Sequence, residues 1–588
     1  MDSKHVTEST SGQEDIQKTW WKEAIIYQIY PRSFQDSDGD GIGDLNGITS
    51  RLDYIQSLGV DIIWLNPIFL SPNDDNGYDI SDYREIMREF GTMEDFDRLL
   101  KEIHKREMRL VLDLVVNHTS DEHPWFEEAR KSRHNPYYNY YHWWPAEKGE
   151  PPLRLSYFDE EGNAWMYNKP TDSYYLHYFS RKQPDLNWEN PEIRQEIFDM
   201  MRFWFDKGID GFRMDSISLI AKDPSFPLID SKKYPDIFSF YAKEPRLHLY
   251  LHEMNRQVLS KYDCMSVGEG SAVMVDDVAK FVDPAREELN MLYHFDAARI
   301  RNTTLPDNPE SGIDYSLIAL KKMFTEWDKA VDKGWPSIYL GNHDQPRMVS
   351  RFGSDKDEFR ALSAKMLITF LLTMRGTPYW FAGDEIGMRN IRFDHIEDYN
   401  DIDTINRYKK AKAEGKDPQA VLDEQKETGR DNARTPFQWD RSPEAGFTAG
   451  TPWLKVNPDY TWINVADEEK DPTSILNYFK KVVSFRKENP SLIYGSYHLL
   501  DAENPQCYTF LRKTGADTYL IMLNFSPKAA ISTPGIDMSN AHVLLDNYGD
   551  RSHMAPQKDI TLRPFEAIVF QLNHPVYESF IDSLDLLE

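Results

Sequence analysis

The sequence contains almost no cysteine: Cys264 and Cys507 are the two in 588 residues. Two cysteines cannot build a disulfide framework, which excludes a small disulfide-stapled module, and we expect both to be buried as small apolar side chains. Long apolar runs are also lacking, because no stretch approaches the roughly 20 residues that a membrane-spanning helix needs. Residues 1–18 are polar and charged, without the apolar segment of a signal peptide. These absences predict a cytoplasmic protein with no membrane partner.

Basic residues are scarce relative to acidic ones. The chain has 68 Lys and Arg against 97 Asp and Glu, a formal net charge of −29. Nucleic-acid binding requires a basic surface, so this balance argues against nucleic acid as a partner, whereas a neutral small substrate is indifferent to it. Aromatic residues are plentiful at 13%. They can build a large core, and their flat faces suit sugar rings or other flat apolar surfaces.

Short apolar, β-branched segments recur along the chain, and longer amphipathic stretches such as 93–106 and 191–207 separate them. The eight segments are 24–30, 61–65, 109–115, 209–213, 265–267, 290–295, 337–340 and 377–381. Strands that alternate with helices form a parallel sheet covered on both faces, and eight such strands close a barrel. The predicted fold is therefore an α/β protein with a (β/α)8 TIM barrel.

Departures from this alternation predict the domain boundaries. The segment after the third strand is too long for a simple loop and is rich in Tyr, Trp, His and Pro, so we expect a small inserted domain there. The predicted divisions are a disordered tail (1–19), the barrel (20–118 and 183–495), the inserted domain (119–182), a helix-pair insertion (389–452) and a C-terminal antiparallel β-sandwich (496–588).

Polar side chains follow the ends of several predicted strands. They are Asn117, His118, Asp215, Glu269, His343 and Asp344. In a (β/α)8 barrel the carboxyl ends of the strands form the active-site face. Two carboxylates on neighbouring strands suit acid/base or nucleophilic chemistry on a glycosidic bond. Arg213 precedes Asp215 by two residues and so points to the same face, where it can keep Asp215 ionised, while His118 and His343 can bind substrate hydroxyls.

The segment DSDGDGIGD, residues 36–44, has the spacing of a calcium loop, with acids at positions 1, 3, 5 and 9 and glycine at position 6. Its expected ligands are the carboxylates of Asp36, Asp38, Asp40 and Asp44 and the carbonyl of Ile42. Position 12 is Gly47 instead of Glu and the loop follows a strand, so it is not an EF-hand. We expect a structural Ca²⁺, with Mg²⁺ as the alternative ion, and no organic cofactor.

The motifs taken together resemble the α-amylase superfamily of retaining glycoside hydrolases. DLVVNH (113–118), GFRMD (211–215), GEG (268–270) and NHD (342–344) occur in that family's order and at its intervals. DNGYDISDY (75–83), QPDLNWEN (183–190), GDEIGM (383–388) and GRDNARTPFQWD (429–440) resemble the oligo-1,6-glucosidase and α-glucosidase branch, which is related to sucrose isomerases and trehalose-forming enzymes. The resemblance extends from Trp20 over nearly the whole chain.

The resemblance implies roles for individual residues. Asp215 matches the nucleophile, Glu269 the general acid/base and Asp344 the transition-state stabiliser. The residues that match sugar-binding positions are Arg213, His118, His343, the platform Tyr78, and the wall residues Phe179 and Gln183. Asp75 and Arg430 match an ion pair that closes the pocket behind the terminal glucose, with Arg434 as a weaker match for the arginine. The loop at 36–44 matches the calcium site of this branch.

The residues beside the catalytic positions bear on specificity. Ser216 follows the predicted nucleophile, where the resembled enzymes carry Val with α-1,6 preference and Thr or Ala with α-1,4 preference. Gly270 stands where many α-1,6 enzymes have Met, which predicts a roomier aglycone side. Sucrose isomerases carry an Arg-rich loop with acidic positions, whereas residues 299–302 read RIRN.

We therefore expect a monomeric, exo-acting α-glucosidase that hydrolyses short oligosaccharides or disaccharides. The alternatives are a sucrose isomerase or trehalose-forming transglucosidase, and a non-enzymatic barrel, which would lose the catalytic acids.

Overall fold

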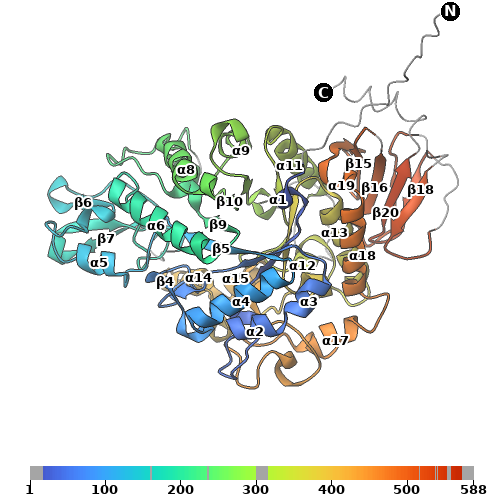
Figure 1. Ribbon diagram of the computed structural model, residues 1–588, viewed down its shortest axis with the longest axis horizontal. Coiled ribbons are helices and arrows are strands. Elements are labelled where there is room, and N and C mark those ends of the chain that lie inside the picture. Colours follow the sequence, from blue (N-terminus) through green and yellow to red (C-terminus); the bar gives the residue numbers. More distant parts are fainter. Residues whose placement is uncertain are drawn as a thin grey trace, which may run out of the picture.

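The computed structural model describes residues 18–158, 162–234, 237–299, 316–515, 517–536, 538, 541–551 and 558–572. A central α/β barrel lies between a small sheet at one end of the long axis and an antiparallel sheet at the other (Figure 1). Most of the predicted tail, residues 1–17, and positions 300–302 of the RIRN loop lie outside the described residues.

The barrel is an eight-stranded parallel sheet with strand order β11-β10-β9-β5-β2-β1-β13-β12. In chain order the strands are β1 (Ile26–Ile29), β2 (Ile62–Leu65), β5 (Arg109–Val115), β9 (Gly211–Asp215), β10 (Met265–Glu269), β11 (Met291–Tyr293), β12 (Ser337–Ile338) and β13 (Thr377–Phe381). β11 and β12 are the two ends of this strand order, and side chains connect them. Ser337 Oγ donates to the carbonyl of Leu292 (2.9 Å), and Tyr339 Oη donates to the carbonyl of His294 (2.5 Å). The sheet is thus a nearly closed barrel, which confirms the predicted fold class.

The strands are buried on both faces because alternate side chains point to opposite sides of the sheet. Ile26, Ile62, Val111 and Val267 pack together inside the barrel, and their neighbours in sequence, such as Ile63, pack outward against the helices. The main outer helices are α2 (Leu45–Ser50), α3 (Leu52–Ser57), α4 (Met93–Lys105), α6 (Pro191–Lys207), α8 (Arg246–Gln257), α11 (Leu317–Ala330), α13 (Arg360–Thr373) and α18 (Ile475–Glu488). Among the described helices, none combines the length and apolar character needed to cross a bilayer.

Local sequence signals start and stop these helices. Thr92 and Asp95 form a reciprocal capping box at the start of α4. The side chain of Asn190 caps α6, which ends at Gly208 in a left-handed conformation (φ 109°). These caps determine where α4 begins and where α6 begins and ends.

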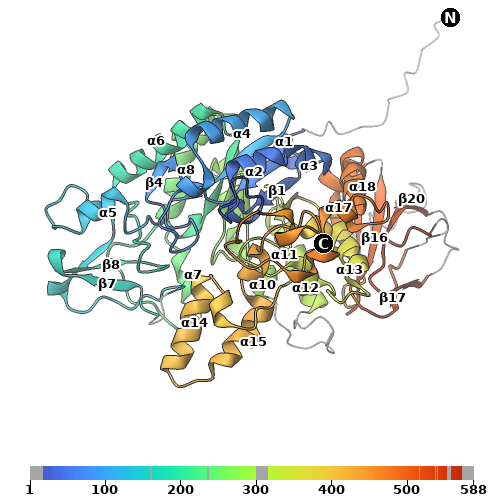
Figure 2. The same cartoon turned by 90° about the horizontal axis from the view of Figure 1, so that it is seen from below.

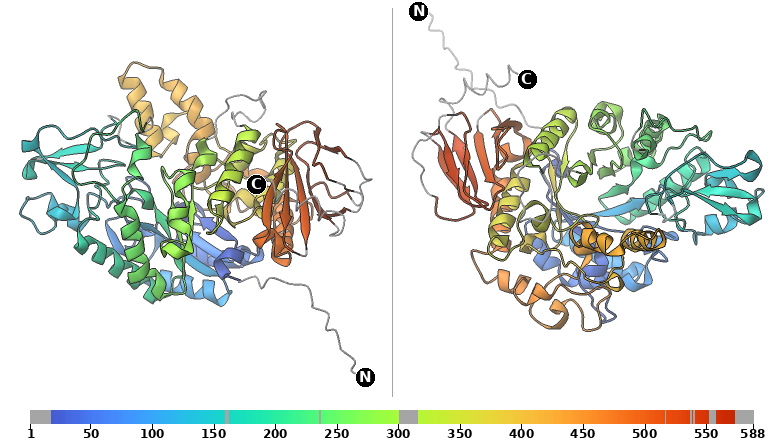
Figure 3. Two further views of the ribbon diagram at one scale, coloured as in Figure 1. Left: turned by 90° about the horizontal axis from the view of Figure 1, so that it is seen from above. Right: turned by 180° about the vertical axis from the view of Figure 1, so that it is seen from behind.

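Two segments interrupt the barrel. After β5 the chain forms α5 (Pro124–Ala129) and a sheet of order β6-β8-β7, with β6 (Trp143–Pro145), β7 (Trp165–Asn168) and β8 (Ser173–Leu176). These elements, here called the inserted segment, lie at the end of the molecule away from the C-terminal sheet (Figure 3). After β13, α14 (Ile402–Ala413) and α15 (Pro418–Thr428) form a helix pair that projects from the barrel (Figure 2).

The C-terminal region packs two antiparallel sheets against each other. One has the order β14-β15-β16-β20-β18, with β14 (Ser496–Leu500), β15 (Cys507–Lys513), β16 (Thr518–Asn524), β18 (His542–Asp546) and β20 (Ala567–Leu572), and the other pairs β17 (Ala530–Ser532) with β19 (Ile560–Leu562). Helix α13 is buried between this region and the barrel. There the ring centroids of Phe370 and Tyr508 are 5.2 Å apart.

The cysteines are both free thiols, but the prediction that both are buried is wrong for one of them. Cys507 is buried in the core of the C-terminal sheets, whereas Cys264 is only partly buried. Cys264 immediately precedes β10, at the amino end of the barrel strand, where the side chain meets the protein surface and its thiol donates to the carbonyl of Leu259 (3.4 Å).

Candidate active site

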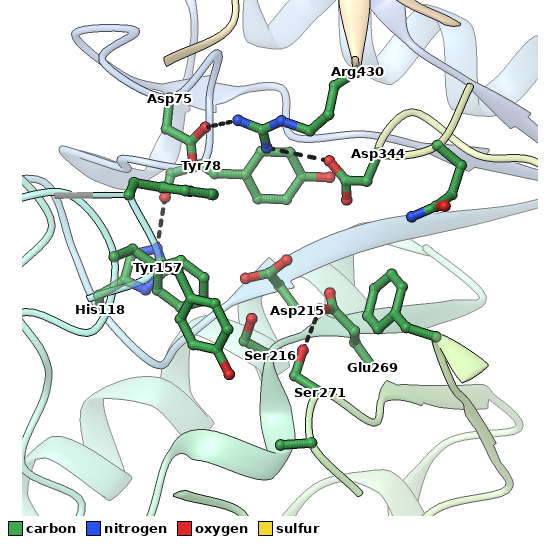
Figure 4. A pocket seen from close by; sticks show the side chains of 15 residues that line it. Asp75, Tyr78, His118, Tyr157, Asp215, Ser216, Glu269, Ser271, Asp344 and Arg430 are labelled. Carbon is green, nitrogen blue, oxygen red and sulfur yellow. Dashed lines mark hydrogen bonds and ion pairs between the residues drawn. The ribbon is translucent and has the colours of Figure 1, made fainter. Parts of the chain in front are cut away.

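A cavity of about 330 Å³ lies at the carboxyl ends of the barrel strands. Its lining comes from the barrel and from the inserted segment: Asp75, Tyr78, His118, Tyr157, Phe158, Phe179, Asp215, Ser216, Glu269, Ser271, Ala272, Phe295, Asp344, Gln345 and Arg430. Figure 4 shows the carboxyl groups of Asp215, Glu269 and Asp344 converging on this cavity. The three acids predicted from the sequence therefore meet in one pocket.

Asp215 and Glu269 are the last residues of the paired parallel strands β9 and β10, so their side chains emerge next to each other. Arg213 lies beneath both and is completely buried. Its Nη1 donates to Asp215 Oδ1 (2.7 Å) and its Nη2 contacts Glu269 Oε2. The predicted ion pair between Arg213 and Asp215 is thus present, and the same guanidinium holds the second carboxyl group.

Arg213 is fixed by two further residues that the sequence analysis did not single out. Its Nη1 also donates to Asp113 Oδ1 (2.6 Å), and its Nε donates to Tyr293 Oη (2.8 Å). Asp113 lies on β5 and is fully buried. A charged residue inside the otherwise apolar run RLVLDLV was the signal that could have identified it, because an isolated buried charge needs a partner.

The two neighbouring carboxyl groups differ in acidity. Burial raises the pKa of Glu269 to about 8, a shift that Arg213 reduces and Asp215 reinforces. Burial also raises the pKa of Asp215, to about 6, because Arg213 offsets part of the cost. Near neutral pH Glu269 is therefore protonated while Asp215 is largely ionised, the division that an acid and a nucleophile require.

Asp344 has the opposite shift. Burial would raise its pKa, but the adjacent imidazole of His343 (Nε2 3.2 Å from Oδ2) and the positive charges of Arg430 and Arg434 outweigh burial and hold the pKa well below its ordinary value. Arg434 Nη2 lies 3.0 Å and Arg430 Nη1 3.3 Å from Asp344 Oδ1. Asp344 is thus a permanent negative charge facing the same cavity.

An ion pair closes one end of the cavity. Arg430 precedes α16 (Asp431–Arg434), and its Nη2 lies 3.4 Å from Oδ1 of Asp75, which lies between β3 (Phe69–Leu70) and β4 (Asp82–Ile86). The guanidinium also pairs with Asp401, a residue that the sequence analysis missed. Arg434 contacts Asp344 and Asp401, so the structure places Arg430 and not Arg434 against Asp75. Burial raises the pKa of Asp75 to about 7 despite Arg430.

The predicted sugar-binding residues divide into pocket-facing and supporting groups. Tyr78, His118 and Phe179 line the cavity. Gln183 lies behind it and donates to Asp75 Oδ2 (3.2 Å). His343 is also behind the lining, stacked on Tyr78 at 5.3 Å, with its Nε2 2.6 Å from Tyr78 Oη.

The two imidazoles are neutral. Burial lowers the pKa of both His118 and His343 to about 3. His118 Nε2 lies 3.0 Å from the carbonyl of Tyr78, and His343 Nδ1 lies 2.8 Å from Gln28 Nε2. Both side chains are therefore held in place by neighbouring groups, and His118 alone of the two reaches the cavity surface.

The expectation for Gly270 is wrong. A Cβ at this position would lie 2.9 Å from Leu292 Cδ2 and 2.9 Å from the carbonyl oxygen of Tyr293, so the side-chain direction leads into packed protein and not into the cavity. Alternation explains this, because Glu269 points inward and its successor points away. The residues that line the cavity next to Glu269 are Ser271 and Ala272.

Further lining residues were not predicted from the sequence. Tyr157 and Phe158 come from the inserted segment. Phe295 follows β11, and Gln345 lies in the loop between β12 and α12 (Met348–Phe352). Aromatic residues in the inserted segment were noticed as a group, but their individual orientation depends on how that segment folds over the barrel.

The acidic loop brings together three of its four predicted carboxylate ligands. Oxygens of Asp36, Asp38 and Asp40 all lie within 4.8 Å of one another. Asp44 is not part of this group, because its carboxylate caps α2, accepting from the amides of Ser37 (2.7 Å) and Gly47 (2.7 Å). Hard oxygen ligands in a glycine-rich loop fit Ca²⁺.

A buried acid pair of unequal pKa, set on adjacent strand ends in a closed pocket, defines a barrel hydrolase of the glycosidase class. The α-amylase catalytic-domain profile matches residues 28–495. The oligo-1,6-glucosidase of Parageobacillus thermoglucosidasius is 51% identical over 571 residues, which cover 95% of this chain and 100% of that protein, and that of Bacillus cereus is 49% identical over 567 residues, with the same coverage. The trehalulose synthase MutB of Pseudomonas mesoacidophila MX-45 superposes with a TM-score of 0.90 at 43% identity, covering 95% of this chain and 100% of that one. The chain belongs to the α-amylase family of glycoside hydrolases.

Proposed function

We propose that the protein is a retaining, exo-acting α-glucosidase that releases glucose from the non-reducing end of short α-glucosides. The observation that carries the proposal is the pocket itself, with Asp215 and Glu269 on adjacent strand ends and the Asp75–Arg430 pair at its end. A pocket closed by an ion pair admits one terminal sugar and excludes a chain that continues past it. The oligo-1,6-glucosidases to which the chain is similar support this class of substrate.

The reaction follows from the two acidities. Asp215 would attack the anomeric carbon while Glu269 gives its proton to the leaving oxygen, which takes the electron pair of the broken bond. Glu269, now a carboxylate, would then take a proton from water, and the water oxygen would displace Asp215 with overall retention. The fixed charge of Asp344 would favour the positive charge that develops on the sugar ring.

The cavity lining favours an uncharged aglycone. Among the described lining residues Arg430 is the sole cation, and its contacts with Asp75 and Asp344 are already made. Ser271, Ala272, Phe295 and Gln345 supply small, aromatic and amide surfaces instead. Such a surface suits a second neutral sugar.

Isomerisation of sucrose is the second candidate, because MutB, a trehalulose synthase, shares the fold over nearly the whole chain. The RIRN sequence lacks the acidic positions of the isomerase loop, so we favour hydrolysis. Product analysis by NMR on maltose, isomaltose and sucrose, sampled early, tests both readings. Early α-glucose with free aglycone supports a retaining hydrolase, and the relative rates give the linkage preference. A new disaccharide with little free glucose would overturn hydrolysis.

Variants of the two acids test whether the products are formed at this site. Asp215→Asn and Glu269→Gln change one atom type each and should lower kcat by several orders of magnitude while the melting temperature stays near that of the parent. Near-normal turnover in either variant would refute the proposed mechanism.

The acidic loop has a separate proposed role. Asp36, Asp38 and Asp40, with the carbonyl of Ile42, would hold a structural Ca²⁺. A bound cation would offset the repulsion among the three carboxylates and stabilise the loop that precedes α2. We further propose a cytoplasmic monomer in which residues 119–182 form the inserted domain.

A further inference from the structure

The carboxyl group of Glu269 has a different partner on each oxygen. Oε2 faces the protein, where Arg213 Nη2 contacts it and Tyr293 Oη lies 3.3 Å away. Oε1 accepts a hydrogen bond from Ser271 Oγ at 2.6 Å. Ser271 lines the cavity whereas Arg213 is completely buried, so Oε1 is the oxygen on the substrate side (Figure 4).

These contacts decide which oxygen carries the proton. Arg213 and Tyr293 both donate to Oε2, whereas Oε1 accepts, among the described residues, from Ser271 alone, so the proton of the neutral carboxyl group lies on Oε1. A hydroxyl that donates to Oε1 occupies one lone pair and leaves the O–H bond free to point into the cavity. The proton is thereby aimed at the position of the leaving oxygen.

The backbone holds Ser271 in position for this contact. Ser218 Oγ donates to the carbonyl of Ser271 (2.6 Å), and the amide of Gly270 donates to the carbonyl of Tyr293 (2.8 Å). Ala272 has a left-handed backbone (φ 59°), which turns the chain away directly after Ser271. A non-glycine residue in this region is strained, and such strain is retained where surrounding contacts fix it.

We propose that Ser271 is a positioning residue for the acid/base Glu269, holding Oε1 toward the leaving group and stabilising the carboxylate that forms once the proton has left. The inference rests on the proposed glucosidase function. In the first step the proton moves from Oε1 to the leaving oxygen as the sugar bonds to Asp215. In the second, Oε1 takes a proton from water as that bond breaks. Ser271 keeps its own proton throughout, and its donation is strongest while Oε1 is charged.

Other charged and titratable groups also face Glu269 and stay unchanged in the test. They are Arg213 and Asp215 on β9, Asp113 on β5, Tyr293 on β11, and Tyr339 and Asp344 beyond β12. Replacement of Ser271 leaves this set intact, so a change in the alkaline limb of the pH profile reports the hydroxyl itself.

The test compares kcat and kcat/KM against pH for the parent enzyme and Ser271→Ala, using maltose or isomaltose and 4-nitrophenyl α-glucoside. Loss of the donor should raise the pKa of Glu269 and so move the alkaline limb of kcat/KM to higher pH, by about half to one pH unit. It should also lower kcat on the disaccharide about tenfold, and less on the nitrophenyl substrate, whose leaving group needs little protonation. Ser271→Thr, which keeps the hydroxyl, should restore both values. Ser271→Cys, a weak donor of similar size, should behave like the alanine variant.

Ser266→Ala is the matched control, because it removes a buried hydroxyl from β10, the strand that carries Glu269, and this hydroxyl contacts Asn290 (3.1 Å to Oδ1) and not Glu269. Its alkaline limb should stay at the parental pH. An unchanged limb and kcat in Ser271→Ala, or equal shifts in Ser266→Ala and Ser271→Ala, would overturn the role of the Ser271 hydroxyl. Failure of the parent enzyme to release glucose from any substrate would instead overturn the proposed function, whatever the variants do.

Discussion

The guanidinium of Arg213 donates from Nη1 to Oδ1 of Asp215 over 2.7 Å, two residues further along the same strand. Residues two apart on a strand share a face, so the Arg213–Asp215 pair follows from the strand geometry of β9 and does not depend on the loops. Arg213 also contacts Glu269, so one guanidinium group is a shared hydrogen-bond donor to both carboxyl groups. The relative acidity of the two groups therefore depends on burial and on this one cation.

We expect a bell-shaped dependence of kcat/KM on pH. Activity requires ionised Asp215, with a pKa near 6, and protonated Glu269, with a pKa near 8. The rate should therefore fall as pH drops below about 6, because Asp215 takes up a proton, and fall as pH rises above about 8, because Glu269 loses one. Initial rates from pH 4.5 to 10 on a disaccharide measure both limbs. A profile that is flat across this range would contradict the assignment.

Arg430→Met should weaken substrate binding at the closed end of the cavity. The variant removes the charge that lies 3.4 Å from Asp75 and 3.3 Å from Asp344. A hydrogen bond to a charged group contributes about 1.5–3 kcal/mol, so kcat/KM on maltose or isomaltose should fall at least about tenfold. Arg407→Met is the control: Arg407 pairs with Glu424 on the projecting helices, and exposed pairs contribute little. Equal effects of the two substitutions would argue against a pocket-closing role.

Lys222→Met should destabilise the protein. Lys222 Nζ pairs with Asp185 Oδ2 (3.0 Å) and donates to Asn117 Oδ1 (2.6 Å), and all three groups are buried. Loss of the cation leaves Asp185 as an uncompensated buried charge, which costs about 3–5 kcal/mol of unfolding free energy. The double variant Lys222→Met/Asp185→Asn removes that charge and should recover part of the loss in a urea titration. A double variant less stable than the single one would show that the pair itself, and not the stranded charge, is what matters.

Calcium removal should affect stability more than turnover. A cation bound only by the folded loop stabilises by about 2.7 kcal/mol at a free concentration of 100 times Kd, so EDTA should lower the melting temperature. The kcat at 25 °C should change little, because none of the three clustered acids lines the cavity. Asp38→Asn/Asp40→Asn should abolish the response of the melting temperature to EDTA. Immediate loss of turnover without destabilisation would place the metal in the chemistry instead.

The barrel and its three acids were predictable from the sequence for a simple reason. All parallel strands of a barrel end at one face, so residues that directly follow predicted strands, such as Asp215, Glu269 and Asp344, must converge there. The clustering of Asp36, Asp38 and Asp40 was predictable because the spacing of acids within a short loop is a local property. The family motifs added the Asp75–Arg430 pair, which joins segments 355 positions apart and which no local pattern could have connected.

The contacts around these groups depended on the assembled fold. The sharing of Arg213 among Asp113, Asp215 and Glu269 follows from the register of β5, β9 and β10, which sets which side chains stand opposite each other. Gly270 was misjudged because alternation at the strand end was not applied, and the same alternation directs Ser271 back to the cavity. The acidity of the site also depended on both levels. The sequence identified the acidic residues, whereas burial and neighbouring charges in the folded protein determined which carboxyl group holds its proton at neutral pH.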